Sequence, residues 1–135
     1  MYSHKVHYYE TDKMGITHHS NYIRWMEEAR IDFLHEIGWD FDRLESEGIV
    51  SPVVSVNCSY KLPTVFAQNI DIEVKVVEFK GVKLILGYQM YNDEGKCVCE
   101  GTSVHAFMDR EGRPLRLKKE FPDFFETLTK LVESE

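Results

Sequence analysis

With 135 residues, the chain suffices for one domain and leaves little room for a second, so we expect a single domain over residues 1–135. Apolar residues make up 43% of the chain, which is enough for a packed core and argues against disorder. The net charge of −7 argues against nucleic-acid binding, and no stretch approaches the roughly 18 consecutive apolar residues that a membrane span needs.

The predicted elements begin with a strand over residues 2–9 and a loop over residues 10–19. A long helix follows, because apolar residues then recur on one face with a period of 3.6 residues. They are Tyr22, Trp25, Met26, Ala29, Phe33 and Ile37. Ser20 or Asn21 is expected to cap the amino end of this helix, and Gly38 suits its carboxyl end.

After a polar stretch at residues 40–48, apolar and polar side chains alternate, which predicts strands. Four are expected, over residues 54–62, 70–76, 82–90 and 98–108. The short links between them imply an antiparallel sheet, and a final helix is predicted from about residue 120 to 132. The order is typical of an α+β fold with helices on one face of the sheet. Some strands carry apolar residues on both faces, so we also expect self-association.

The cysteines number three, Cys58, Cys97 and Cys99, and no CxxC spacing is present. An odd count argues against a disulfide framework, so we interpret them as reduced packing residues. Residues 1–10 contain no apolar run, and a signal peptide is not expected. Both observations fit a protein of the cytoplasm.

The loop ahead of the long helix concentrates groups that can do chemistry. It contains the carboxylates of Glu10 and Asp12, the imidazoles of His18 and His19, and Gly15. The first turn of a helix presents unpaired N–H groups and a partial positive charge, which would stabilise an oxygen that develops negative charge. A carboxylate beside it could attack a carbonyl or activate water.

Spacing alone leaves other roles open. Asp12 is equally suited to capping a turn. A metal site of His18 and His19 with Asp12 is not expected, because consecutive residues rarely bind one ion and no third histidine or cysteine stands at a helpful spacing. His4 and His7 would point to opposite faces of the predicted strand, so they are not expected to be a ligand pair. These residues predict hydrolysis or proton transfer and nothing narrower.

The pattern around this loop resembles the signature of the 4-hydroxybenzoyl-CoA thioesterase-like group of hotdog-fold enzymes, which includes the acyl-CoA thioesterases associated with the Tol–Pal system. The residues that carry it are Tyr8, Asp12, Gly15, Ile16, His19, Asn21, Tyr22, Trp25, Glu27 and Arg30. Weaker resemblance at residues 56–63 and 101–109 extends it over nearly the whole chain. The resemblance implies one hotdog domain, in which an antiparallel sheet of about five strands wraps a long central helix and a short helix follows at the carboxyl end.

The resemblance also implies an activity, which is hydrolysis of an acyl-CoA thioester to a free acid and coenzyme A without a metal or organic cofactor. It implies a homodimer or homotetramer with active sites at the dimer interface. By position, Asp12 would be the nucleophile or general base. The backbone N–H of His19 would receive the carbonyl oxygen, and the His19 side chain and Tyr8 would assist. The residues implied to shape the substrate site are Gly15, His18, Asn21, Tyr60 and Pro63.

The chain departs from the family pattern at Thr17 and His18, where members often have Val and Tyr, and at Thr64, where they often have Ala. The role of His18 and the identity of the acyl group therefore stay open. Two other functions also stay open: a non-catalytic acyl-CoA-binding hotdog module, and a hotdog enzyme acting on acyl-carrier-protein thioesters. A dehydratase is disfavoured because its own pattern of histidine and acid is not found in this sequence.

Overall fold

The computed structural model describes residues 1–133, and its centre is one antiparallel sheet of five strands. In chain order the strands are β1 (Tyr2–Lys5), β2 (Val53–Tyr60), β3 (Asn69–Phe79), β4 (Lys83–Tyr91) and β5 (Cys97–Ala106). Their order across the sheet is β1-β3-β4-β5-β2, and every neighbouring pair is antiparallel. The predicted α+β hotdog architecture is therefore confirmed.

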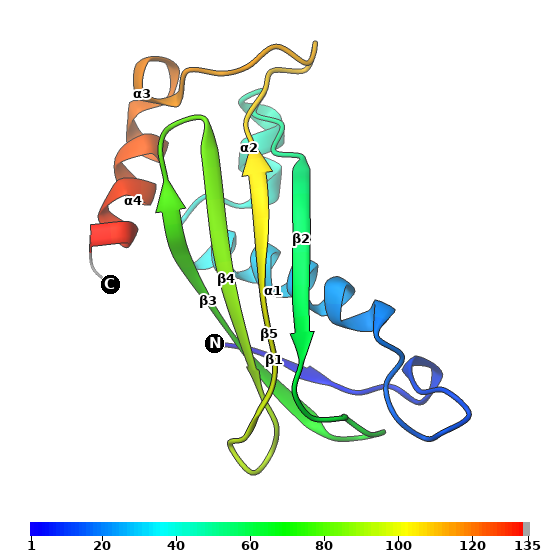
Figure 1. The fold of residues 1–135 in the computed structure, drawn as a ribbon. Coiled ribbons are helices and arrows are strands. Elements are labelled where there is room, and N and C mark those ends of the chain that lie inside the picture. The colour runs from blue at the N-terminus through cyan, green and yellow to red at the C-terminus, as the bar shows by residue number, and fades with distance from the viewer. Residues whose placement is uncertain (134–135) are drawn as a thin grey trace.

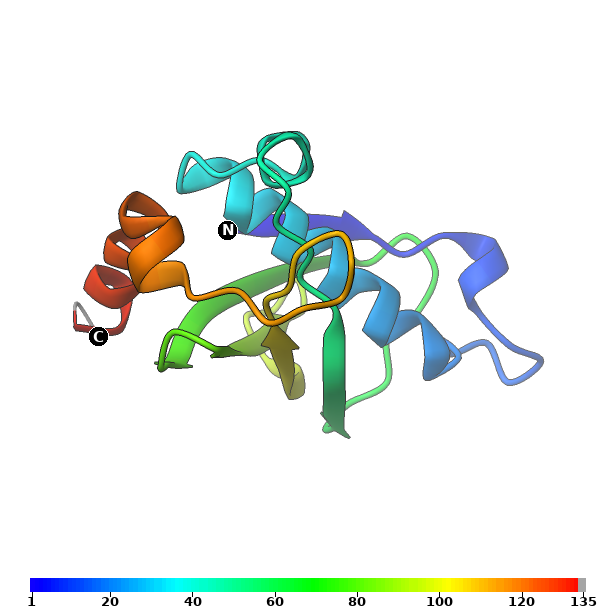
Figure 2. The same ribbon diagram turned by 90° about the horizontal axis from the view of Figure 1, so that it is seen from above.

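The long helix α1 (Ser20–Glu36) lies across one face of the sheet (Figures 1 and 2). Its predicted apolar stripe is the buried side, with Trp25 and Met26 almost fully enclosed. Full burial of such a side chain contributes about 1.5–3 kcal/mol, so the stripe is enough to fix the helix on the sheet.

The ends of α1 differ in how well the sequence predicts them. At the carboxyl end, Gly38 has a positive φ of 85°, and Trp39 N–H donates to the carbonyl of Leu34 in a Schellman motif, as expected. At the amino end, the capping prediction is wrong. His19 occupies the N-cap without a side-chain cap, and the Asn21 amide turns toward the preceding loop.

The first predicted strand is too long. β1 ends at Lys5, and Tyr8–Glu10 form a 3-10 turn, η1. Val6 still pairs with the segment before β3, and the chain then turns away because the buried Glu10 carboxylate accepts the His7 N–H. A carboxylate that folds back on its own backbone in this way competes with strand pairing.

Two helical regions depart from the pattern. The polar stretch contains a short helix, α2 (Phe41–Ser46), which buries Leu44 and is too brief for a periodic signal. The predicted final helix of about residues 120–132 forms as α4 (Pro122–Glu133), and a separate short helix that was not predicted, α3 (Leu117–Glu120), precedes it. The two helices are separated at Phe121, because the residue before a proline, here Pro122, is disfavoured in a helix.

The edge strand β2 leaves apolar side chains uncovered. Among the described residues it pairs only with β5, and Val53 and Val54 are 50% and 63% exposed. The three cysteines are free. No helix within residues 1–133 combines the length and the apolar character needed to cross a membrane.

Candidate active site

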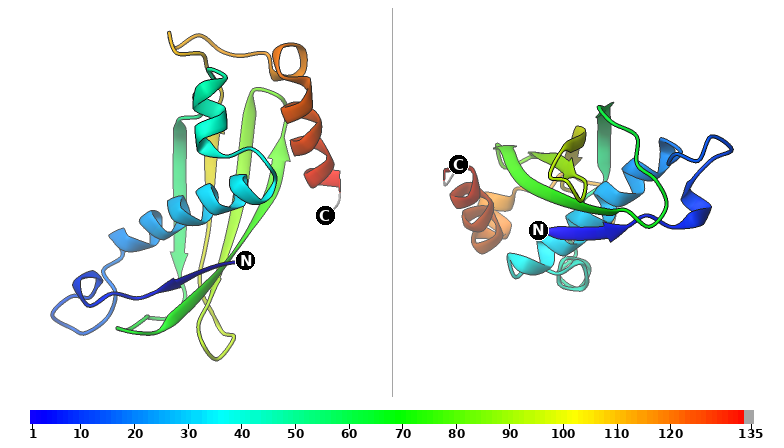
Figure 3. Two further views of the ribbon diagram at one scale, coloured as in Figure 1. Left: turned by 180° about the vertical axis from the view of Figure 1, so that it is seen from behind. Right: turned by 90° about the horizontal axis from the view of Figure 1, so that it is seen from below.

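A pocket of about 430 Å³ opens beside the amino end of α1, between the loop of residues 11–19 and the end of β2. Five of the predicted site residues line it: Asp12, His18, His19, Tyr60 and Pro63. Figure 3 shows this loop extending past the end of the helix. A larger pocket of about 600 Å³ lies beside α2 and contains none of the predicted site residues. The structure therefore gathers the predicted chemistry at one place, although it is not the most spacious one.

A tight turn presents Asp12 to the pocket. Asp12 N–H donates to the Ile16 carbonyl at 2.9 Å, and Gly15 N–H donates to the Asp12 carbonyl at 3.0 Å. Gly15 has a φ of 81°, a conformation that glycine adopts without steric cost. Thr11 and Thr17 form a bridge that closes the base of the turn. Gly15 thus shapes the loop from outside the pocket lining.

The Asp12 side chain is exposed and only partly engaged. Its Oδ1 accepts a hydrogen bond from Met14 N–H at 2.8 Å, so the alternative of a turn cap is realised for one oxygen. Within residues 1–133, Oδ2 accepts no hydrogen bond and no cation forms an ion pair with Asp12. One carboxylate oxygen is therefore available to a ligand in the pocket.

The amino end of α1 supplies a hydrogen-bond donor. The N–H groups of Asn21 and Tyr22 donate to the carbonyls of His18 and His19. Across the described part of the chain, no group accepts a hydrogen bond from the backbone N–H of His19. Such an N–H, at the positive end of the helix dipole, suits a ligand oxygen that carries negative charge.

Aromatic rings form much of the pocket wall. The rings of His18 and His19 stack with centroids 4.4 Å apart, and His18 Nδ1 lies 2.8 Å from Ser20 Oγ. The Tyr60 ring meets His19 edge-on at 6.1 Å and lies 5.1 Å from Tyr22. An aromatic wall of this kind favours an apolar or aromatic ligand group.

Thr64 supports this wall from behind, and sequence reasoning noted it only as a departure from the family. It is fully buried, and its Oγ1 lies 3.1 Å from Tyr22 Oη and 2.5 Å from Thr17 Oγ1. Burial raises the pKa of Tyr22, although the hydrogen bond with Thr64 works the other way. Tyr22 therefore stays a neutral hydroxyl fixed against the pocket. Lys61 also lines the pocket, and the sequence pattern did not identify it as a site residue.

Two buried polar residues join the loop to the helix. The Nδ2 of Asn21 donates to the backbone carbonyls of Glu10 at 3.0 Å and His18 at 3.2 Å. The Glu10 carbonyl also accepts the His18 N–H at 2.8 Å. The two ends of the loop that carries Asp12 are thus held together.

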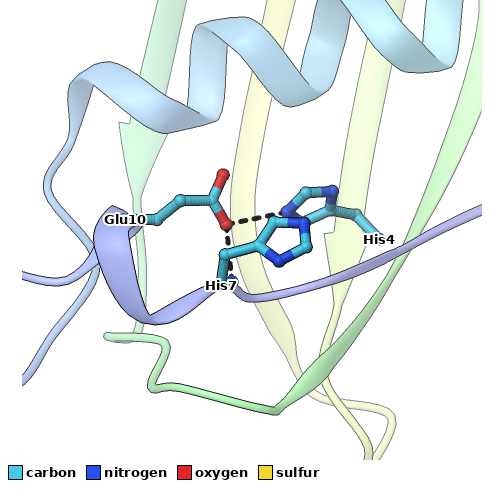
Figure 4. Close-up of side chains that lie close together, drawn as sticks. All are labelled: His4, His7 and Glu10. Carbon is cyan, nitrogen blue, oxygen red and sulfur yellow. Dashed lines mark hydrogen bonds and ion pairs between the residues drawn. The ribbon is translucent and has the colours of Figure 1, made fainter.

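The Glu10 carboxylate is itself buried in a network. Its Oε1 accepts the His7 N–H at 2.8 Å and lies 2.9 Å from His4 Nε2 (Figure 4). Its Oε2 accepts Trp25 Nε1–H at 2.8 Å. Burial alone would raise the pKa of Glu10, but the hydrogen bonds from His7, His4 and Trp25 lower that pKa below its ordinary value. Glu10 is therefore held as a carboxylate.

The placement of His4 and His7 on opposite faces of a strand is wrong, because β1 ends between them. Their ring centroids lie 5.4 Å apart, nearly perpendicular. Tyr8, in contrast, is 76% exposed and meets the Phe66 ring at 5.7 Å, outside the pocket lining. Its catalytic role stays a prediction.

Comparison with known proteins agrees with this architecture. Residues 6–128 match the family described as "Thioesterase-like superfamily". The chain is 36% identical over 121 residues to the "Putative acyl-CoA thioesterase YneP" of Bacillus subtilis (strain 168), a match that covers 89% of this chain and 88% of that protein.

Solved structures resemble it throughout. A DHNA-CoA thioesterase from Staphylococcus aureus superposes with a TM-score of 0.92 at 29% identity, over 98% of this chain and 89% of the other. A gentisyl-coenzyme A thioesterase superposes with a TM-score of 0.81 at 26% identity, over 90% of this chain and 98% of the other. Because the family match spans most of the chain, the protein belongs to the thioesterase-like superfamily of hotdog-fold proteins.

Proposed function

We propose that this protein is an acyl-CoA thioesterase with Asp12 as its catalytic carboxylate. One observation carries the proposal: the same pocket is lined by Asp12, whose Oδ2 accepts no hydrogen bond within residues 1–133, and by His19, whose backbone N–H has no acceptor in that range and lies at the start of α1. YneP and the two structural relatives are all named as CoA thioesterases, which supports the same reaction class.

In the proposed reaction the thioester carbonyl oxygen accepts the His19 N–H, which stabilises the negative charge that develops on it. Asp12 either attacks the carbonyl carbon or removes a proton from an attacking water. The carbon–sulfur bond then breaks, and the coenzyme A thiolate leaves and takes up a proton. Water supplies the second oxygen of the released acid, directly or by hydrolysis of an acyl-Asp12 intermediate.

The other predicted residues have supporting roles in this scheme. Gly15 and Asn21 hold the loop, whereas His18, Tyr60 and Pro63 face the ligand. The stacked histidines and the neighbouring tyrosines favour an acyl group that is itself aromatic, like those in the names of the DHNA-CoA and gentisyl-CoA thioesterases.

We further propose that the protein works as a homodimer, paired into a homotetramer, in the cytoplasm. The exposed valines of β2 and the open edge of that strand support association, because uncovered apolar edges are otherwise a liability. The end of β2 also forms one wall of the pocket, so a partner seated on this strand would narrow the site. The free cysteines are consistent with a reducing compartment.

A thiol-release assay over short, medium, long and aromatic acyl-CoAs tests the activity. Asp12→Asn is expected to lower kcat at least about 100-fold, because a positioned carboxylate contributes roughly that much or more. Asp71→Asn is the matched control, since Asp71 is also exposed and also accepts one hydrogen bond, from Ser3 Oγ. The control variant is expected to keep parental kcat and KM.

Three results would redirect the proposal. Full activity in Asp12→Asn would refute the site. Binding of acyl-CoA in calorimetry with no thiol release would favour the non-catalytic module. Cleavage of acyl-carrier-protein thioesters alone would favour the third function left open by the sequence.

A further inference from the structure

A second cluster of potential ligands lies just before the loop that carries Asp12, outside the pocket lining. It consists of His4, His7 and Glu10, and Figure 4 shows their side chains turned toward one another. One ligand atom from each residue lies within 4.8 Å of the other two. His4 and Glu10 are buried, whereas His7 is exposed.

We propose that this cluster binds one divalent transition-metal ion, with Zn²⁺ best suited to its donors. Two imidazoles and one carboxylate form a typical zinc ligand set, and the fourth position goes to water. At zinc–ligand distances of about 2.0–2.1 Å, the ligand atoms of a tetrahedral site lie roughly 3.3 Å apart. His4 Nε2 and Glu10 Oε1 are already 2.9 Å apart, and a ring nitrogen of His7 lies within 4.8 Å of the ligand atoms of both residues.

The groups behind the cluster resemble the outer partners of a metal site. Glu28 Oε2 lies 3.2 Å from His4 Nδ1, so that nitrogen can donate its N–H while Nε2 binds the ion. Trp25 Nε1–H donates to the Glu10 oxygen that faces away from His4. Carboxylates behind metal-binding histidines, and donors behind metal-binding carboxylates, orient the ligands in this way.

The charge around His4 also favours a cation. Each of its ring nitrogens faces a carboxylate oxygen, from Glu10 and Glu28. A neutral imidazole carries one N–H and can donate to only one of them. When Nδ1 donates its N–H to Glu28, the lone pair of Nε2 faces the Glu10 oxygen, and a metal ion bound to both atoms would complete this contact. A bound ion would join the end of β1 to η1, immediately before the loop that carries Asp12.

Isothermal titration calorimetry of the EDTA-treated protein with ZnCl₂ tests this proposal. We expect one ion per chain, a higher Tm with zinc than without it, and the intense visible absorption of tetrahedral cobalt when Co²⁺ replaces zinc. His7→Ala removes an exposed ring, so its metal-free Tm should equal that of the parent while zinc binding is lost. Glu28→Gln, which alters only an outer partner, should weaken binding about 10- to 100-fold.

His35→Ala is the matched control, because His35 is an exposed histidine of α1 paired with Asp40 at 2.6 Å and distant in sequence from the cluster. It should bind zinc as the parent does. Absence of zinc binding by the parent would overturn the proposal, as would undiminished binding by His7→Ala. Loss of binding in His18→Ala but not in His7→Ala would place the ion in the pocket instead, and would also overturn it. None of these readouts depends on thioesterase activity.

Discussion

A buried histidine of β5 makes the stability of this protein depend on pH. His105 is only 1% exposed, its Nε2 lies 2.7 Å from Ser103 Oγ, and Ser103 Oγ in turn lies 2.7 Å from Tyr88 Oη. Within residues 1–133 its Nδ1 has no hydrogen-bond partner. Burial, and then the nearby Arg30 cation, lower the pKa of His105 to about 4 from an ordinary 6.5. The folded protein therefore holds a neutral ring.

The sign of the effect follows from the lowered pKa. Above about pH 6.5 the ring is neutral in both the folded and the unfolded chain, so stability does not vary with its protonation. Between pH 6.5 and about 4 the unfolded chain binds a proton that the folded chain does not, and the free energy of unfolding falls as pH falls. Each pH unit corresponds to about 1.4 kcal/mol, so the total loss from His105 approaches about 3 kcal/mol.

Urea unfolding of the parent and of His105→Gln, each at about pH 7.5 and about pH 4.5, isolates this contribution. The other titratable groups are the same in the two proteins, so their effect on stability cancels in the comparison. The parent should lose about 2–3 kcal/mol more than the variant between the two conditions. His35→Gln, which removes an exposed histidine, should follow the parent. Parallel pH dependences in the parent and His105→Gln would show that His105 titrates alike in both states, and the reasoning from burial would be wrong.

Two further substitutions test how the site is held. Asn21→Ala should lower kcat and destabilise the fold by about 1–3 kcal/mol, because it removes the side-chain donor to the carbonyls of Glu10 and His18. Steady-state kinetics measures the change in kcat, and urea unfolding measures the change in stability. An unchanged kcat would argue against a positioning role for Asn21. Gly101→Ala should lower the free energy of unfolding by at least about 1–3 kcal/mol, because the added Cβ on β5 would lie 2.5 Å from the Asn57 carbonyl oxygen of β2. A Tm equal to that of the parent would contradict this packing.

The elements with a clear period could be predicted from the sequence. The apolar stripe of α1 and the alternation in β3 and β4 each report one buried face, and their bounds came within a few residues. The prediction failed where burial is set by a polar group. The pattern predicts a first strand through Tyr9, whereas β1 ends at Lys5, because nothing in the pattern shows that the Glu10 carboxylate turns the chain back at His7.

The pattern of β2 is informative in a different way. Its alternating sequence predicts a strand over residues 54–62 with one apolar face, and the strand forms at Val53–Tyr60, yet within one chain every residue of it except Cys58 is exposed. Apolar alternation records the surroundings in which a strand is stable, which need not all come from the same chain. The β2 sequence has the apolar alternation of a strand with a buried face, but its side chains are exposed in a single chain. This difference supports the proposed association through β2 independently of the family resemblance.

The candidate site was predictable as a list of residues and not as a structure. Asp12 and His19 could be named from the loop, but the groups that place them were hidden because the roles of Glu10 depend on contacts across the fold. The Glu10 side chain reaches β1 and Trp25, while its backbone carbonyl accepts hydrogen bonds from His18 and Asn21 at the start of α1. One residue therefore couples the sheet, the long helix and the loop that carries Asp12. A change that releases the Glu10 carboxylate should disturb Asp12 and His19 together, even though Glu10 does not line the pocket.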